Sequence, residues 1–130
     1  MVLDFFIVMS DPANLYREEI LENFRNPQNY GTLNAFDAKS KQQNPLCGDE
    51  IELFIQFNND EVYDISFLGK GCAISISSTS ILTEYVKDKK KKHIKQLTDD
   101  ELIDILGIEI SDARKKCALL GLYVLRDCLA

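Results

Sequence analysis

Hydrophobic and polar positions alternate with period two in the middle of the chain, which predicts two β-strands with one buried face each. The apolar positions of the first strand are Ile51, Leu53, Ile55 and Phe57. Those of the second are Tyr63, Ile65 and Phe67. The turn cluster Asn58-Asn59-Asp60 separates the two runs, so they should form an antiparallel hairpin.

Helical spacing and helix-start signals flank this hairpin. Ser10-Asp11-Pro12 predicts the start of a helix that ends near Asn26-Pro27. A second helix is expected over about residues 73–87, after the turn at Gly69-x-Gly71. The last two should begin at the capping box of Thr98 and at Ser111-Asp112. Residues 33–43 predict only a short edge strand that ends before Asn44-Pro45.

The chain has 130 residues, 45% of them hydrophobic, which fits a single domain with one core. We assign this domain to residues 10–130. Residues 1–9 contain an apolar stretch, Val2 to Met9, that is either an arm docking on the body or a partner, or upstream sequence with Met9 as a second start. It is too short for a secretory signal and lacks a basic first region.

Charge is unevenly distributed. The net charge of −6 argues against nucleic acid as a partner. Residues 87–95 hold six lysines and one aspartate, or +5, so the remainder carries −11. Such a run is usually a solvated face, although it could dock an acidic partner. His93 lies in this run and is interpreted as a surface residue.

Four cysteines are too few for a disulfide scaffold, and no stretch is long enough to span a bilayer. We therefore expect a cytoplasmic protein with reduced thiols and no membrane partner. In that setting, metal binding or thiol chemistry is favoured over structural bridges.

Three thiols and one carboxylate are candidates for one metal site. Cys47-Gly48-Asp49 precedes the hairpin and Cys72 follows it, so the hairpin brings them to the same end. Cys72 and Cys117 each lie near the start of a predicted helix, where a thiolate is favoured. Zinc and iron–sulfur clusters both accept thiolates, and a carboxylate oxygen makes one position more labile than a fourth thiolate would.

Two residues on the same predicted helix as Cys117 are not assigned as metal ligands. Cys128 lies eleven residues after Cys117 on the same helix, roughly 16 Å along its axis, so we assign it a structural role. Arg114 lies one turn before Cys117 and could pair with Asp49 or stabilise a thiolate or persulfide; the alternative is a solvated arginine.

Together these motifs resemble the U-type iron–sulfur cluster assembly family: IscU, SufU and the N-terminal domain of NifU. The resemblance runs from about Leu15 to the C-terminus. Its motifs are Leu15-Tyr16-Arg17, Arg25-Asn26-Pro27, Asn29-x-Gly31, Asn44-Pro45-x-Cys47-Gly48-Asp49, Gly69-x-Gly71-Cys72-Ala73-Ile74-Ser75 and Arg114-x-x-Cys117-Ala118.

The resemblance implies an α+β fold, with a three-stranded antiparallel sheet covered on one side by helices. It implies that Cys47, Asp49, Cys72 and Cys117 line the metal or cluster site, and that Cys117 accepts persulfide sulfur from a cysteine desulfurase. Scaffold members are non-enzymatic: they build a two-iron cluster and transfer it to apoproteins. SufU-type members instead bind zinc in the same site and relay sulfur to a separate scaffold.

The chain departs from both types. Ile110-Ser111-Asp112-Ala113-Arg114 replaces the Leu-Pro-Pro-Val-Lys segment of the scaffold type, which puts recognition by the dedicated Hsp70-type chaperone in doubt. Lys116 occupies the position of the scaffold type's histidine. Arg114 and the motif Asn-Pro-x-Cys-Gly-Asp resemble the SufU type. However, the spacing from Cys72 to Cys117 lacks the SufU insertion of about twenty residues, which favours the scaffold hypothesis over the zinc-dependent sulfurtransferase.

Overall fold

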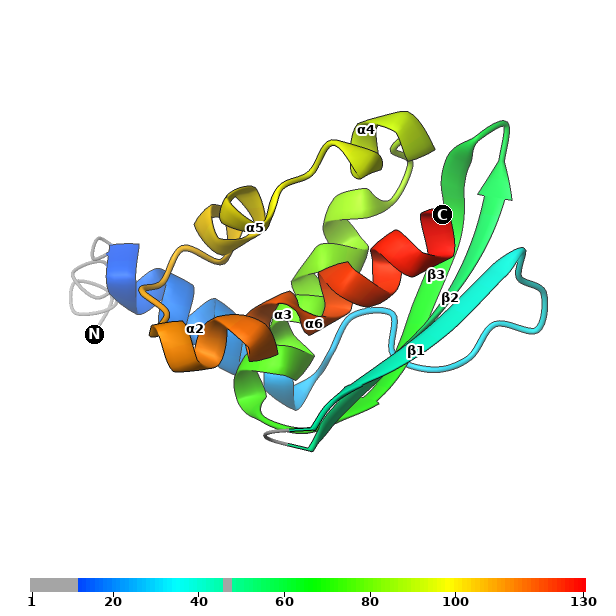
Figure 1. Ribbon diagram of the computed structural model, residues 1–130. Coiled ribbons are helices and arrows are strands. Elements are labelled where there is room, and N and C mark those ends of the chain that lie inside the picture. The colour runs from blue at the N-terminus through cyan, green and yellow to red at the C-terminus, as the bar shows by residue number, and fades with distance from the viewer. Residues whose placement is uncertain (1–11, 46–47) are drawn as a thin grey trace, which may run out of the picture.

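The computed structural model describes residues 12–45 and 48–130, with side chains from residue 15 on. Its sheet has three antiparallel strands in the order β1-β2-β3 (Figure 1). The strands are β1 (Ala38–Asn44), β2 (Asp49–Asn58) and β3 (Glu61–Lys70). The expected hairpin and sheet are confirmed. The expectations for residues 1–11, including the start of the first helix, lie outside the described residues.

A β-bulge near the β2–β3 turn corrects one prediction. Asn59 and Asp60 both have positive φ, 54° and 64°, as a two-residue hairpin turn requires. The register then shifts between Gln56 and Phe57, and a bulge turns the following side chain to the other face. Val62 is consequently buried, whereas Tyr63 is 62% exposed. The prediction that Tyr63 shares the buried face of Ile65 and Phe67 is wrong.

The edge strand β1 is longer than expected and runs through Asn44. Its sequence is almost entirely polar, so no apolar alternation marks it. Polar contacts attach it to the last helix, α6 (Asp112–Leu129): Ser40 and Gln42 both donate to the carboxylate of Asp127. In the register of the strands, Asn44 lies opposite Asp49.

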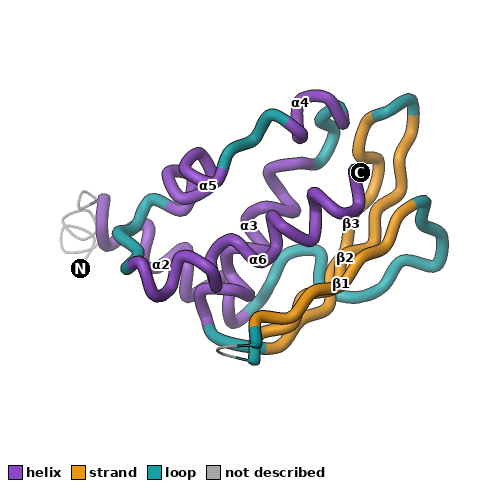
Figure 2. Tube along the Cα trace, in the orientation of Figure 1, coloured by secondary structure: helices purple, strands orange, loops and turns teal. Residues whose placement is uncertain are grey.

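The helices cover one face of the sheet, as the resemblance implied (Figure 2). The others are α2 (Pro12–Arg25), α3 (Ala73–Val86), α4 (Lys91–Lys95) and α5 (Asp99–Leu106). Helix α6 packs across β1 and β2, α3 packs against β3 and α6, and α2 packs on α3. The core between these layers is built from residues such as Ile51, Leu53, Phe67, Leu122 and Leu125.

Helix α5 begins as predicted at the capping box of Thr98 and Glu101 and ends at Gly107 in the left-handed conformation. Helix α4 was not predicted, because three of its five residues are lysine and no apolar period marks it. Its single apolar residue, Ile94, is buried in the core. This one contact, with the backbone around it, fixes the lysine-rich segment on the body.

Helices α3 and α6 approach each other closely. A methyl group on Gly121 of α6 would lie 2.5 Å from Oγ1 of Thr79 on α3. The buried hydroxyls of α3 are bonded to carbonyls: Thr79 donates to the carbonyl of Ser75, and Ser78 donates to that of Ala118 across the interface. This contact sets the position of both helices, and so of the cysteines near their starts. Among the described helices, none has the length and hydropathy to cross a membrane.

Candidate metal centre

Three separate elements bring one carboxylate and two thiols together. Asp49 is the first residue of β2, Cys72 is the N-cap of α3, and Cys117 lies in the second turn of α6. The three starts meet at the lower end of the molecule in Figure 1. One ligand atom from each residue lies within 4.8 Å of the others. The sequence prediction that these three residues share a site therefore agrees with the structure.

Asp49 is 1% exposed and is held by the turn before α3. The backbone N–H of Cys72 donates to its Oδ1 at 2.9 Å, and Sγ of Cys72 lies 3.7 Å from Oδ2. Gly71 has φ of 143°, and a methyl group on it would lie 2.7 Å from Cγ of Asp49. Glycine is needed here both for the backbone angle and for the space the carboxylate occupies.

Cys117 is 6% exposed and lies beside the end of β1. The side-chain amide of the buried Asn44 donates toward its Sγ at 4.0 Å. An N–H group directed at sulfur favours the thiolate form, which is the metal ligand and the nucleophile. Asn44 was quoted in the sequence motif without a role. The register of β1 on β2 places it opposite Asp49, which no pattern in the sequence indicated.

Cys47 lies outside the described residues, so its part in the ligand set stays a prediction. Its neighbour Gly48 has φ of 71°, and the N–H of Gly48 donates to the carbonyl of Asn44 at 2.8 Å. Gly48 therefore turns the chain in the left-handed region immediately before Asp49.

A cavity of about 560 Å³ opens beside the thiols. Its lining residues are Asn44, Cys72, Asp112, Ala113, Arg114, Lys116 and Cys117. Arg114 is exposed at this cavity, and no ion pair within the described ranges joins it to Asp49. Stabilisation of a thiolate or persulfide by Arg114, and the alternative of a solvated arginine, both stay predictions.

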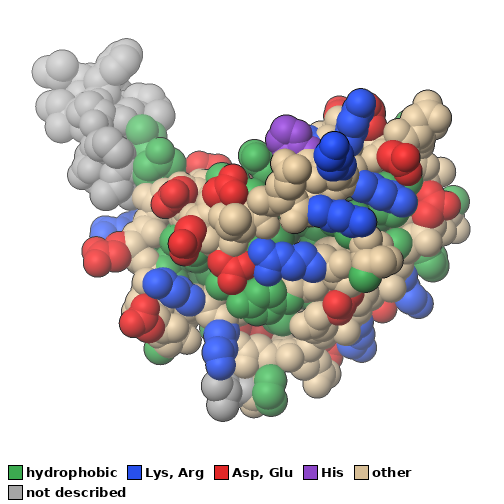
Figure 3. All heavy atoms as spheres, turned by 45° about the horizontal axis from the view of Figure 1, so that its top comes forward, with side chains coloured by type: hydrophobic (Ala, Val, Ile, Leu, Met, Phe, Trp, Pro, Cys, Tyr) green, Lys and Arg blue, Asp and Glu red, His purple; other side chains and the backbone are tan. Residues whose placement is uncertain are grey.

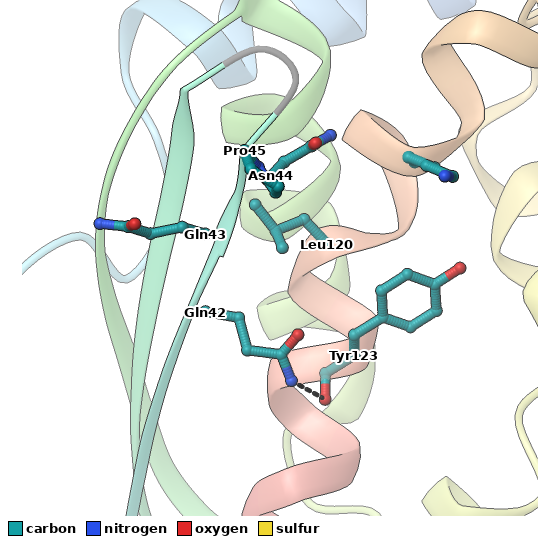
Figure 4. Close-up of a pocket in the computed structure, with 7 residues that line it drawn as sticks. Gln42, Gln43, Asn44, Pro45, Leu120 and Tyr123 are labelled. Carbon is teal, nitrogen blue, oxygen red and sulfur yellow. Dashed lines mark hydrogen bonds between the residues drawn. The ribbon is translucent and has the colours of Figure 1, made fainter.

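A smaller cavity of about 220 Å³ adjoins the site along α6 (Figure 4). Asn44 and Lys116 line both cavities. In Figure 4, Gln42 points toward Tyr123 and donates to its carbonyl at 3.4 Å. This contact joins β1 to α6 beside the cavity.

The remaining candidates fall outside the site. Cys128 is partly buried and packs against the core. Burial, followed by the charge of Asp127, raises the pKa of its thiol to about 11, so it is protonated at neutral pH, as a structural role requires. His93 is exposed on α4, as expected of a surface residue.

The donor set fits a soft or borderline metal. Thiolates select zinc or iron in iron–sulfur clusters, whereas sites for magnesium and calcium are built from oxygen. Two buried or partly buried thiols with one buried carboxylate meet that chemistry. When bound, zinc would supply positive charge that keeps a thiol deprotonated.

Comparison with known proteins places the chain among cluster assembly proteins. It is 34% identical over 142 positions to the zinc-dependent sulfurtransferase SufU of Bacillus subtilis, covering 94% of this chain and 96% of that one. It is 35% identical over 112 residues to the iron-sulfur cluster assembly scaffold protein IscU of Aquifex aeolicus, covering 85% and 71%.

A solved structure agrees. A putative iron-sulfur cluster assembly scaffold protein for the SUF system from Fervidobacterium islandicum superimposes with a TM-score of 0.75 at 26% identity, over 87% of this chain and 95% of that one.

The alignment with the Bacillus protein also bears on length. It spans 142 positions, but 94% of this 130-residue chain is only about 122 residues. About 20 positions therefore hold residues that this chain lacks.

Residues 15–130 match the family described as NifU-like N terminal domain, which agrees with the resemblance seen in the motifs. The match covers most of the chain and includes the strands, the helices from the first turn of α2 onward and every candidate ligand. This protein therefore belongs to the NifU-like N-terminal domain family.

Proposed function

We propose that this protein is an iron–sulfur cluster assembly scaffold. It accepts sulfur from a cysteine desulfurase, assembles a two-iron cluster on Cys47, Asp49, Cys72 and Cys117, and transfers the cluster to apoproteins. The observation that carries the proposal is the meeting of Asp49, Cys72 and Cys117 within 4.8 Å at an open cavity. The cavity gives a sulfur donor and an acceptor thiolate access to the same side of the site.

The ligands have different tasks in this proposal. Cys117, held beside Asn44, is the acceptor of persulfide sulfur. Asp49 supplies the oxygen ligand, which binds iron less tightly than a thiolate and is the first to exchange. Arg114 and Lys116 place positive charge at the cavity, where it would attract an anionic persulfide.

The proposed chemistry needs reduced thiols, which persist in a reducing compartment such as the cytoplasm. The direct partners of the protein would be the desulfurase and the apoproteins that receive the cluster.

Anaerobic reconstitution tests the proposal. The protein is incubated with ferrous iron, cysteine, a cysteine desulfurase and a thiol reductant, and iron and labile sulfide are then measured per chain. We expect both to accumulate in equal amounts on the wild type and to be lost in Cys72→Ser and Cys117→Ser. Cys128→Ser is the matched control, since it removes a thiol from the same helix as Cys117 and should load normally. Equal loading of all four proteins would overturn the proposed site.

A second candidate is a zinc-dependent sulfurtransferase that relays persulfide sulfur to a separate scaffold. The similarity to SufU over nearly the whole chain favours it, whereas the roughly 20 residues missing from this chain do not. The test is desulfurase turnover with zinc-loaded protein. Strong stimulation that disappears in Cys117→Ser, without accumulation of iron and sulfide on the metal-free protein, would favour this function over the scaffold.

A further inference from the structure

The lysine-rich segment forms a defined face at α4. Lys90, Lys92 and Lys95 are exposed, and none of them takes part in an ion pair within the described ranges. We call these three residues the lysine patch. Two neighbours are differently engaged: Lys89 donates to the carbonyl of Tyr85 and lies 4.2 Å from its ring centre, and Lys91 lies 4.0 Å from that of Phe57. Figure 3 shows basic side chains gathered over α4.

The patch is held rigidly by the backbone beneath it. The N–H of Val62 donates to the carbonyl of Lys89, and the N–H of Lys91 donates to that of Asp60. Ile94 anchors the same segment in the core at 3% exposure. A binding partner would therefore lose little free energy in ordering this segment.

The patch borders a cavity of about 580 Å³. Its lining residues are Asp60, Lys90, Lys91, Lys92, Lys95 and Gln96. One carboxylate, that of Asp60, already lies 4.0 Å from the ammonium group of Lys91. Further carboxylates entering this cavity would meet three exposed ammonium groups.

We propose that the lysine patch docks an acidic segment of a partner protein. Charge complementarity carries the choice of partner, since residues 87–95 hold +5 on a chain whose remainder holds −11. The long phosphate backbone of a nucleic acid would be repelled by that acidic remainder. An anionic membrane fits less well, because Ile94 is buried and α4 offers no apolar side chain for insertion.

The patch lies far from the thiols. Glu61, at the start of β3, is bridged to Lys90, while the other end of β3 leads to Cys72. Ten residues of strand at about 3.3 Å each separate these ends by about 30 Å. A partner on the patch leaves the thiols open. The inference is independent of the proposed function, because no ligand of the metal centre takes part.

Titration with a fluorescent glutamate-rich peptide tests this inference. Anisotropy gives the affinity of the full chain, and amide chemical shifts locate the bound peptide. The test variant is Lys90→Glu/Lys92→Glu/Lys95→Glu. The matched control, Arg17→Glu/Arg25→Glu/Lys39→Glu, makes the same change in net charge at exposed positions elsewhere.

We expect saturable binding that weakens with added salt, with shifts confined to α4 and the β2–β3 turn. The patch variant should lose about tenfold in affinity and the control much less. Equal losses in the two variants, or shifts centred on Arg114 and Cys117, would overturn the proposal. So would equal or tighter binding of a single-stranded oligonucleotide, or of vesicles with equal parts of phosphatidylcholine and phosphatidylserine. The peptide titration does not measure iron loading. A failure of the docking proposal would therefore leave the scaffold proposal unaffected.

Discussion

At the scale of single residues, the candidate ligands of the site could be predicted from the sequence, but the residues that hold those ligands in place could not. Asp49 and Cys72 were expected together, because the hairpin brings their chain positions to one end. Cys117 was added because it lies near a helix start and matches a motif of the family. Asn44 was not assigned a role, because its contact with Cys117 joins residues 73 positions apart. No local pattern encodes a contact of that kind.

Asp49 should control release of the cluster. As the oxygen ligand of the proposed cluster, its carboxylate exchanges more readily than a thiolate and opens iron to an acceptor. Asp49→Ala removes this route. We expect the cluster of the variant to persist several-fold longer, measured by the decay of its visible absorbance under anaerobic conditions. A shorter or unchanged lifetime would contradict this role.

Gly71 should be required for the placement of that carboxylate. In Gly71→Ala, the added methyl group would overlap Asp49, and φ of 143° would be strained. We expect a loss of about 1–3 kcal/mol in the free energy of unfolding and weaker retention of bound zinc. Urea unfolding and competition with a zinc chelator measure the two effects. Gly48→Ala is a useful comparison, since φ there is also positive but its methyl group would meet no atom within 4 Å. Zinc retention as weak in Gly48→Ala as in Gly71→Ala would argue against the overlap.

Cys128 should resist modification at neutral pH. Its thiol pKa is raised from 9.0 to about 11, so at pH 8 it holds about a hundredfold less thiolate than an unperturbed thiol. Alkylation by iodoacetamide, followed residue by residue by mass spectrometry, should rise toward pH 11. Because the folded state holds this proton more tightly, the contribution of Cys128 to stability is complete below pH 9 and falls as pH rises toward 11. An alkylation midpoint at or below 9 would show that burial does not protect the thiol.

At the scale of elements, apolar periodicity predicted β2, β3 and most of the helices. It failed where the elements lack apolar residues. Strand β1 is polar and is held by Gln42 and Ser40 on Asp127, while α4 is held by the side chain of Ile94 and by backbone hydrogen bonds to Asp60 and Val62. The error at Tyr63 has another cause: Gln56 pairs with Asp64 and Phe57 with Val62, so Tyr63 is the extra residue of a bulge in β3. No periodic pattern of apolar residues in the sequence marks this bulge.

The contact of α3 with α6 should be sensitive to size at Gly121. A Cβ there meets Oγ1 of Thr79 at 2.5 Å, and both helices carry site thiols near their starts. Gly121→Ala should lower the free energy of unfolding by about 1–3 kcal/mol, and Gly121→Val by more. The same series should weaken iron loading in step with stability. Unchanged thermal unfolding of both variants would show that the two helices can move apart without a loss of stability.

At the scale of the whole molecule, the two proposals place functional sites at opposite ends of the protein. The thiols and Asp49 lie where β2, α3 and α6 begin, and the lysine patch lies at the other end of β3. The fold class followed from the motifs and from the alternation of the hairpin. The position of the patch did not, since a lysine run has no period that says which surface it joins. The position of the patch is shown by the backbone hydrogen bond from Val62 to Lys89.

Transfer of a cluster is the most direct test of the account. The protein is loaded anaerobically, separated from free iron and sulfide, and mixed with an apo-ferredoxin of the two-iron type, and circular dichroism follows the cluster on each protein. The account predicts that the signal moves from this protein to the ferredoxin faster than the cluster decays alone. A chain that holds no cluster under these conditions, yet in its zinc-loaded form stimulates the desulfurase, would contradict it.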